Sequence, residues 1–119
     1  MLDAVGQAAV TNQISILTGS VMERDHMYSD AALLFRPDGT MEEYDKRALW
    51  EWDRNDFVSG TGNGIVRIGP VKIGIRICFE VRFPEYFREL YKVRTLLYSH
   101  SSANQNPREA QCLYSFVLI

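Results

Sequence analysis

The segment Lys72–Glu85 reads KIGIRICFEVRFPE and changes from a strand pattern to a helix pattern along its length. Apolar residues occupy every second position from Val71 to Ile77, which predicts a strand. Pro84 suits the first turn of a helix, and apolar side chains recur at helical spacing at Phe83, Phe87 and Leu90. The segment therefore predicts a strand followed by a helix, with Cys78 at the junction.

Cys78 stands where a thiol can do chemistry. At a strand end just before a helix N-terminus, a thiolate is stabilised and can be presented to a ligand. Most free cysteines pack in a core, so burial is the alternative interpretation. The charged neighbours Arg76, Glu80, Arg82 and Glu85 favour a functional role, because a purely structural junction does not need them.

Hydrophobic periodicity divides the rest of the chain into short elements. Helices are predicted over Leu2–Gln13 and Pro84–Lys92, and Arg108–Ile119 has the pattern of a further helix start. The predicted strands are Ile14–Gly19, Ala31–Phe35, Met41–Tyr44, Ile65–Ile68, Val71–Ile77 and Thr95–Tyr98.

Three connections have distinct patterns. The segment Pro37–Thr40 reads PDGT and predicts a hairpin turn, since Pro presets φ and Gly accepts a left-handed conformation. Glu23–Asp30 predicts a polar connector. Asp45–Gly64 lacks clear periodicity, and its aromatic residues predict an ordered, packed loop: Trp50, Trp52 and Phe57.

The order strand, helix, strand from Val71 to Tyr98 implies a parallel strand pair with a right-handed crossover. The carboxyl ends of parallel strands meet at one edge of a sheet, where ligands bind in open α/β folds. We therefore expect Cys78 and the polar segment Ser99–Asn106 on the same rim.

Composition limits the possible functions. The 119 residues suffice for one small domain with a core, predicted over 1–119. The net charge of -2 gives no basic field for nucleic acid or anionic membranes, and no apolar run is long enough to span a bilayer. The only two cysteines, Cys78 and Cys112, lack disulfide-framework, zinc or Cys-x-x-Cys spacing. We expect a reduced, cytoplasmic setting, no metal or cofactor, and no thiol redox role.

A cysteine nucleophile needs a base and a group that stabilises the developing oxyanion. His26 and His100 are available as bases, but no spacing links either to Cys78, so a surface role is the alternative. Lys46 opens the irregular loop directly after a predicted strand. If held near Cys78, it would favour the thiolate and a tetrahedral intermediate, whereas most surface lysines are simply solvated.

Together these segments resemble the nitrilase superfamily, the carbon–nitrogen hydrolases. The resemblance is carried by three blocks, which cover most of Ile16–Ser102: YSDAALLFRPDGTMEEYDKRALW, DRNDFVSGTG and KIGIRICFEVRFPE. It implies an α/β (α+β) fold that is part of a four-layer α-β-β-α sandwich with a mixed sheet. It also implies a Glu-Lys-Cys catalytic set in which Cys78 is the nucleophile and Lys46 stabilises the oxyanion, helped by the backbone N–H of Phe79.

The general-base glutamate of the family lies in an earlier block, and Phe83-Pro84-Glu85 is the block after the cysteine instead. A second acidic residue follows the lysine in the family, and Asp53 best fits that place, with Glu51 as the alternative. The apolar end Ser115–Ile119 lacks a stop signal. These features predict a central part of a longer domain.

The resemblance predicts hydrolysis of non-peptide carbon–nitrogen bonds, in amides or nitriles, through a cysteine thioester. The expected partners are a small-molecule substrate and, in the longer parent, further copies of the same chain, with no nucleic acid and no membrane. The chain alone would have little activity. The alternative is a non-catalytic interaction module that pairs through an exposed sheet face.

Overall fold

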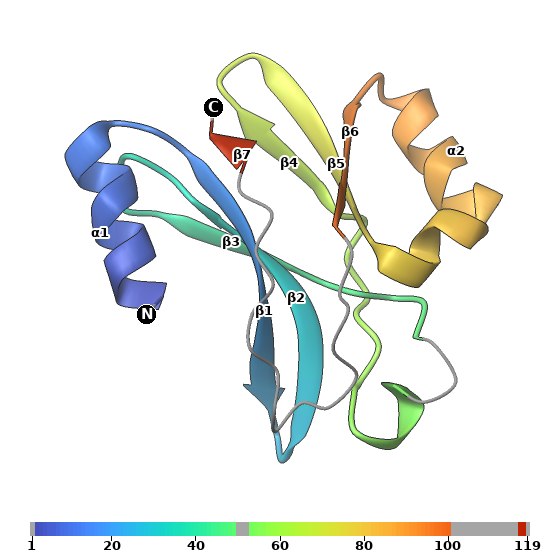
Figure 1. Cartoon of the computed structure of the whole chain (residues 1–119). Helices are drawn as coiled ribbons and strands as arrows, with labels where there is room; N and C mark the ends of the chain where they lie inside the picture. The colour runs from blue at the N-terminus through green and yellow to red at the C-terminus, as the bar shows by residue number, and fades with distance from the viewer. Residues whose placement is uncertain (1, 50–52, 101–116, 119) are drawn as a thin grey trace.

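The computed structural model describes residues 2–49, 53–100 and 117–118, and for residues 53, 81, 96–100 and 117–118 it describes the backbone alone. The elements form four layers (Figure 1): helix α1, a first sheet, a second sheet and helix α2. The first sheet has the strand order β3-β2-β1-β7 and the second has the order β4-β5-β6. The predicted α-β-β-α arrangement is confirmed.

Helix α1 (Leu2–Asn12) covers the outer face of the first sheet. Its Ala9 is fully buried against a cluster of sheet residues: Ile16, Ala31, Leu33 and Phe35. The prediction of a helix over Leu2–Gln13 is confirmed to within one residue. Gln13 has a φ of 54°, a left-handed conformation that ends the helix.

Strands β1 (Ile16–Arg24) and β2 (Met27–Phe35) form a long antiparallel hairpin, with Ile16 opposite Phe35 and Arg24 opposite Met27. The predicted connector Glu23–Asp30 is therefore wrong. Only Asp25 and His26 form the turn, with φ values of 47° and 70°. A type I′ two-residue turn needs positive φ at both positions, which Asp and His tolerate better than most residues. The polar flanks of the turn remain in the strands.

The run AALLF in β2 is buried on both faces, as its continuous apolar character predicts. Alternate residues pack toward α1, whereas Ala32 and Leu34 point into the core between the sheets. The hairpin turn PDGT is also confirmed, because the Arg36 N–H donates to the Thr40 carbonyl at 2.9 Å and Gly39 has a φ of 85°. It leads into β3 (Met41–Asp45), which pairs antiparallel with β2.

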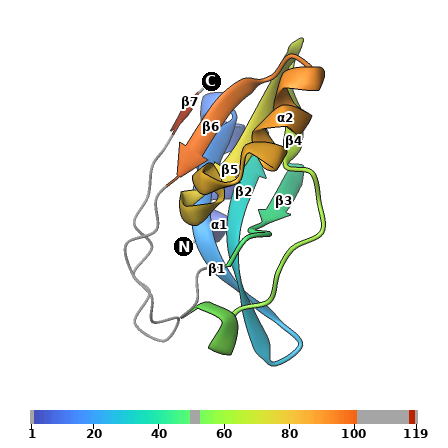
Figure 2. The same cartoon turned by 90° about the vertical axis from the view of Figure 1, so that its right-hand side faces the viewer.

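The second sheet joins β4 (Ile65–Ile68) antiparallel to β5 (Val71–Ile77), and β5 parallel to β6 (Leu96–His100). Helix α2 (Pro84–Lys92) makes the crossover between β5 and β6. The predicted parallel pair is confirmed, with Ile77 opposite His100. Figure 2, seen from the α2 side, shows the second sheet in front of the first.

The two faces of β5 have different neighbours. Ile73, Ile75 and Ile77 belong to the core between the sheets, which also holds Leu17, Leu34, Tyr44 and Val66. On the opposite face, a Cβ atom at Gly74 would lie 2.3 Å from the Leu90 Cδ2 atom. Glycine at this position therefore lets α2 pack closely on the strand.

The predicted helix start at Arg108–Ile119 is wrong for Val117–Leu118, which form strand β7. These two residues pair antiparallel with Leu17 and Ile16 of β1. Valine and leucine occur in both helices and strands, and here the two residues form a strand because they pair with the edge of β1. Residues 101–116 and 119 lie outside the described residues.

Replacing Leu90 by alanine tests the packing of α2 on β5. Leu90 is 5% exposed and Tyr91, its neighbour on the helix, is 86% exposed. We expect Leu90→Ala to lower the free energy of unfolding by about 2–5 kcal/mol, because it leaves a cavity over Gly74. Tyr91→Ala should change it by no more than about 0.5 kcal/mol. Urea denaturation of both variants measures the difference, and equal effects would contradict this packing.

Candidate active site

Cys78 lies at the end of β5 and begins the 3-10 helix η2 (Cys78–Arg82), which leads into α2. It is half-buried and packs against the core between the sheets. Its φ of 46° is in the left-handed region, which few non-glycine residues adopt. Such a backbone costs free energy, and strained residues of this kind cluster at active sites as well as in turns. The sharp turn begins at the cysteine itself.

Lys46 follows β3 directly and is only 3% exposed. Its Nζ atom lies 3.7 Å from Oδ2 of Asp30, and its backbone N–H donates to the Asp30 carbonyl at 2.8 Å. Burial of an ammonium group is costly unless an opposite charge accompanies it. Lys46 is therefore a buried, charge-paired lysine, unlike the solvated surface lysine that was the alternative.

The sequence interpretation missed Asp30 as the partner of Lys46, because Asp30 was placed in a connector. The register of the β2–β3 hairpin contains the signal that finds it. Phe35 pairs with Met41 and Ala31 with Asp45, so the next position places Asp30 opposite Lys46. A turn that is recognised correctly thus also predicts the ion pair across the strands.

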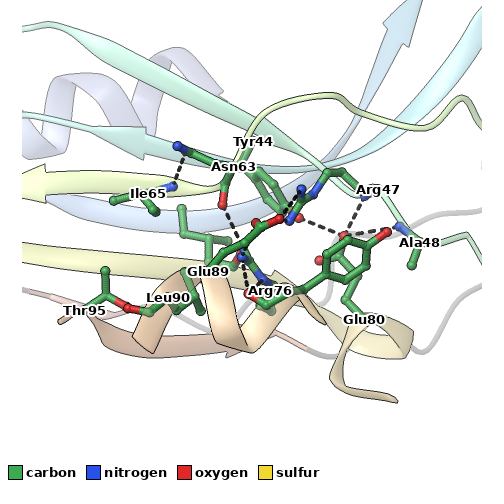
Figure 3. Close-up of polar contacts among 12 residues, drawn as sticks. Tyr44, Arg47, Ala48, Asn63, Ile65, Arg76, Glu80, Glu89, Leu90 and Thr95 are labelled. Atoms are coloured by element: carbon green, nitrogen blue, oxygen red, sulfur yellow. Dashed lines mark hydrogen bonds and ion pairs between the residues drawn. The ribbon is translucent and has the colours of Figure 1, made fainter. Parts of the chain in front are cut away.

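Glu80, two residues after Cys78, links the cysteine turn to the lysine segment (Figure 3). Its side chain is fully buried. Oε2 accepts a hydrogen bond from the Ile77 N–H at 2.8 Å. Oε1 accepts from the Tyr44 hydroxyl at 2.8 Å and from the N–H groups of Arg47 at 2.6 Å and Ala48 at 3.3 Å. The two predicted segments therefore meet through one carboxylate.

The Tyr44 hydroxyl remains a donor in this network. Burial and the neighbouring Glu80 carboxylate both raise the pKa of Tyr44. Its ring is 2% exposed and belongs to the core between the sheets. The side chain thus joins the polar network to the apolar core.

Arg76 is a cationic neighbour of Cys78 in sequence, and its guanidinium binds backbone carbonyls and a carboxylate of α2. It is fully buried and donates to the carbonyls of Asn63 at 2.8 Å and Tyr86 at 2.6 Å. It also lies 3.4 Å from the Glu89 carboxylate of α2, and burial lowers its pKa. Arg76 therefore ties α2 and the β3–β4 loop to β5.

The loop between β3 and β4 is ordered around Phe57, as predicted. Phe57 is 7% exposed, and its ring centroid lies 6.4 Å from that of Tyr28. Val58 donates its N–H to the Tyr28 carbonyl, and Gly60 donates to the Lys46 carbonyl at 2.9 Å. The loop thus returns alongside the lysine. Trp50 and Trp52 lie outside the described residues.

The other predicted site residues are only partly placed. Asp53 begins the 3-10 helix η1 (Asp53–Asn55), described here by its backbone, and Glu51 lies outside the described residues, as does Cys112. His26 is exposed in the β1–β2 turn. The predicted loop Ser99–Asn106 is wrong for Ser99 and His100, which extend β6 and pair with Arg76 and Ile77, and the rest of that segment lies outside the described residues. The Phe79 ring packs edge-on against Phe83, with centroids 5.1 Å apart.

Two kinds of feature are absent from the described part of the chain. Within residues 2–49, 53–100 and 117–118, no three His, Cys, Asp or Glu residues gather as a metal ion would need. No helix among these residues is both long and apolar enough to cross a membrane.

The four-layer fold is shared with solved structures of the nitrilase superfamily. Nit3 of Saccharomyces cerevisiae, described as a member of branch 10 of that superfamily, matches with a TM-score of 0.72 at 19% identity over 87% of this chain. An amidase from Nesterenkonia sp. AN1, solved as a glutamate-to-glutamine mutant after Michael addition of acrylamide at the active-site cysteine, gives 0.70 at 20% identity over 83%.

The family model for carbon–nitrogen hydrolases matches residues 1–113, and the chain therefore belongs to that family. An (R)-stereoselective amidase from Pseudomonas sp. is 24% identical over 106 residues, which is 89% of this chain. The chain spans 39% of the length of that amidase, 40% of the Nit3 chain and 41% of the Nesterenkonia chain.

Gly60 and Gly62 provide a matched test of how the loop holds the lysine segment. A Cβ atom at Gly60 would lie 2.1 Å from the Asp45 carbonyl oxygen, whereas at Gly62 nothing lies within 4 Å. Gly60→Ala should lower the free energy of unfolding by about 1–3 kcal/mol, because backbone next to Lys46 must move. Gly62→Ala should stay within about 0.5 kcal/mol of the parent in urea denaturation. A harmless Gly60→Ala would show that the loop does not touch this segment.

Proposed function

We propose that this chain contributes the nucleophile of a cysteine hydrolase that cleaves non-peptide carbon–nitrogen bonds, with amides as the substrate class. The observation that carries the proposal is the Cys78 turn: a half-buried thiol in a left-handed conformation, tied through Glu80 to the segment of a buried lysine. Reactive thiols are partly exposed and have a cationic group near them, and we propose that Lys46 supplies that group.

The reaction proceeds in two covalent steps. The Cys78 thiolate attacks the amide carbonyl carbon, and the carbonyl electron pair moves to oxygen. The Lys46 ammonium and the Phe79 N–H stabilise this oxyanion. The carbon–nitrogen bond then breaks, the amine leaves with a proton, and a thioester remains on Cys78. Water attacks the thioester, which releases the carboxylic acid and restores the thiol.

The proton transfers need a general base. The family resemblance implies a glutamate in an earlier block, for which we assign no counterpart in these 119 residues. We propose Asp53, with Glu51 as the alternative, only as the second acidic residue of the site. Loss of a general base slows such reactions by about 10²–10⁴-fold, so we expect the chain alone to turn over little substrate.

Similarity to amidases supports amides over nitriles, because the Pseudomonas relative is named as an amidase. The glutamate-to-glutamine mutant of the Nesterenkonia amidase carries acrylamide added at its active-site cysteine, which supports a cysteine as the nucleophile here. We further propose a cytoplasmic setting, since neither cysteine has disulfide-framework spacing, and self-association of the longer parent protein.

Acylation by an activated ester tests the nucleophile without requiring turnover. We expect p-nitrophenyl butyrate to add one butyryl group to the Cys78 peptide, detected by mass spectrometry after digestion. Cys78→Ala should abolish this adduct, and the matched control Cys112→Ala should retain it. Lys46→Met should slow acylation by about 10²–10³-fold, because it removes one donor to the oxyanion.

Other patterns of labelling would contradict the proposal. Acylation at Cys112 alone, or no adduct on either cysteine, would favour the non-catalytic interaction module. An unchanged acylation rate in Lys46→Met would remove Lys46 from the mechanism while leaving Cys78 as the nucleophile.

A further inference from the structure

We propose that Glu80 is a positioning residue: its buried carboxylate sets Lys46 against Cys78. This inference deepens the proposed function and rests on it, since it assigns no chemistry to Glu80 itself. It concerns the distance between the two groups that act on the substrate. The hydrogen bonds that carry it run from Glu80 to backbone N–H groups and to the Tyr44 hydroxyl.

The contacts of Glu80 bracket both groups. On one side, Oε2 accepts the N–H of Ile77, the residue immediately before the cysteine. On the other side, Oε1 accepts from Tyr44, two residues before the lysine, and from the backbone of Arg47 and Ala48 just after it. One rigid, planar group thus joins the backbones on which the nucleophile and the cation are built.

The chemistry of the donors requires a carboxylate at this position. All the partners described are N–H or O–H donors, and an ionised carboxylate is an acceptor on both oxygens. A glutamine has the same shape but places an NH₂ group against one side of the network. That NH₂ group must face either the Ile77 N–H or the three donors near Lys46. Two donors then face each other, and the hydrogen bonds on that side are lost.

Glu80 could instead influence Cys78 only through its negative charge, and its replacement would then change the reaction rate of Cys78 in the other direction. A carboxylate near a thiol disfavours the thiolate, so Glu80→Gln would then speed the reactions of Cys78. If Glu80 acts by holding Lys46 in place, the same substitution loosens the cation and slows them. The sign of the change therefore separates the two roles.

Alkylation of Cys78 by iodoacetamide at pH 6 is the test, because it reports thiolate without any acyl transfer. Peptide mass spectrometry reads Cys78 separately from Cys112. We expect Glu80→Gln and Lys46→Met each to slow Cys78 alkylation by about five- to tenfold. The double variant should be no slower than Lys46→Met, since Glu80 acts only through Lys46. Glu85→Gln, which changes an exposed glutamate in the first turn of α2, should match the parent.

Several outcomes would overturn the inference. Faster alkylation in Glu80→Gln means a local charge effect, and an unchanged rate means no influence on the thiol. Rates that multiply in the double variant mean that Glu80 acts independently of Lys46. If urea denaturation shows that Glu80→Gln is too unstable to stay folded during alkylation, Tyr44→Phe takes its place, because it removes only one donor to Oε1. Tyr44→Phe is then combined with Lys46→Met, and rate effects that multiply in this double variant would again overturn the proposal.

This result and the acylation result are independent. Coupled alkylation rates without an acyl adduct would support the positioning role and contradict the hydrolase. An acyl adduct on Cys78, together with alkylation rates that change independently in Glu80→Gln and Lys46→Met, would support the hydrolase and contradict the positioning role.

Discussion

The hydrogen bonds of the buried Glu80 carboxylate hold the candidate site together. Isolated buried carboxylates are expensive, and this one is satisfied by donors from two segments far apart in sequence. The second sheet supplies the cysteine turn, and the end of β3 in the first sheet supplies the lysine segment. Glu80 therefore crosses the boundary between the two sheets at the point where their apolar core ends.

The apolar core and this polar junction constrain each other. Ile75 and Ile77 place β5 over Leu34 and Tyr44, and Tyr44 then directs its hydroxyl to Glu80. On the outer face of β5, Gly74 admits Leu90 and Arg76 binds carbonyls on either side. Helix α2 and the strained turn at Cys78 are thereby held in one arrangement, which is what a preorganised catalytic group requires.

Lys46 illustrates how the same hairpin serves fold and site. Its register with β2 places Asp30 beside the ammonium, and the carbonyl of Lys46 receives the returning loop at Gly60. The side chain is thus buried with a counter-charge and little freedom to move. A proposed oxyanion partner built in this way loses little conformational entropy when substrate binds.

Strong local signals in the sequence were enough to predict the alternation in β5, the proline at the start of α2, the PDGT turn and the position of Cys78 at a junction. Local signals did not predict the turn at Asp25 and His26, because it contains no glycine or proline and lies within a polar run. They also did not predict the strand at Val117 and Leu118, which forms by pairing with the edge of β1. The contact of Glu80 with the lysine segment and the pairing of Asp30 with Lys46 became visible only in the folded chain. Those contacts join residues distant in the chain, and local propensity contains no information about which distant donors a buried carboxylate will meet.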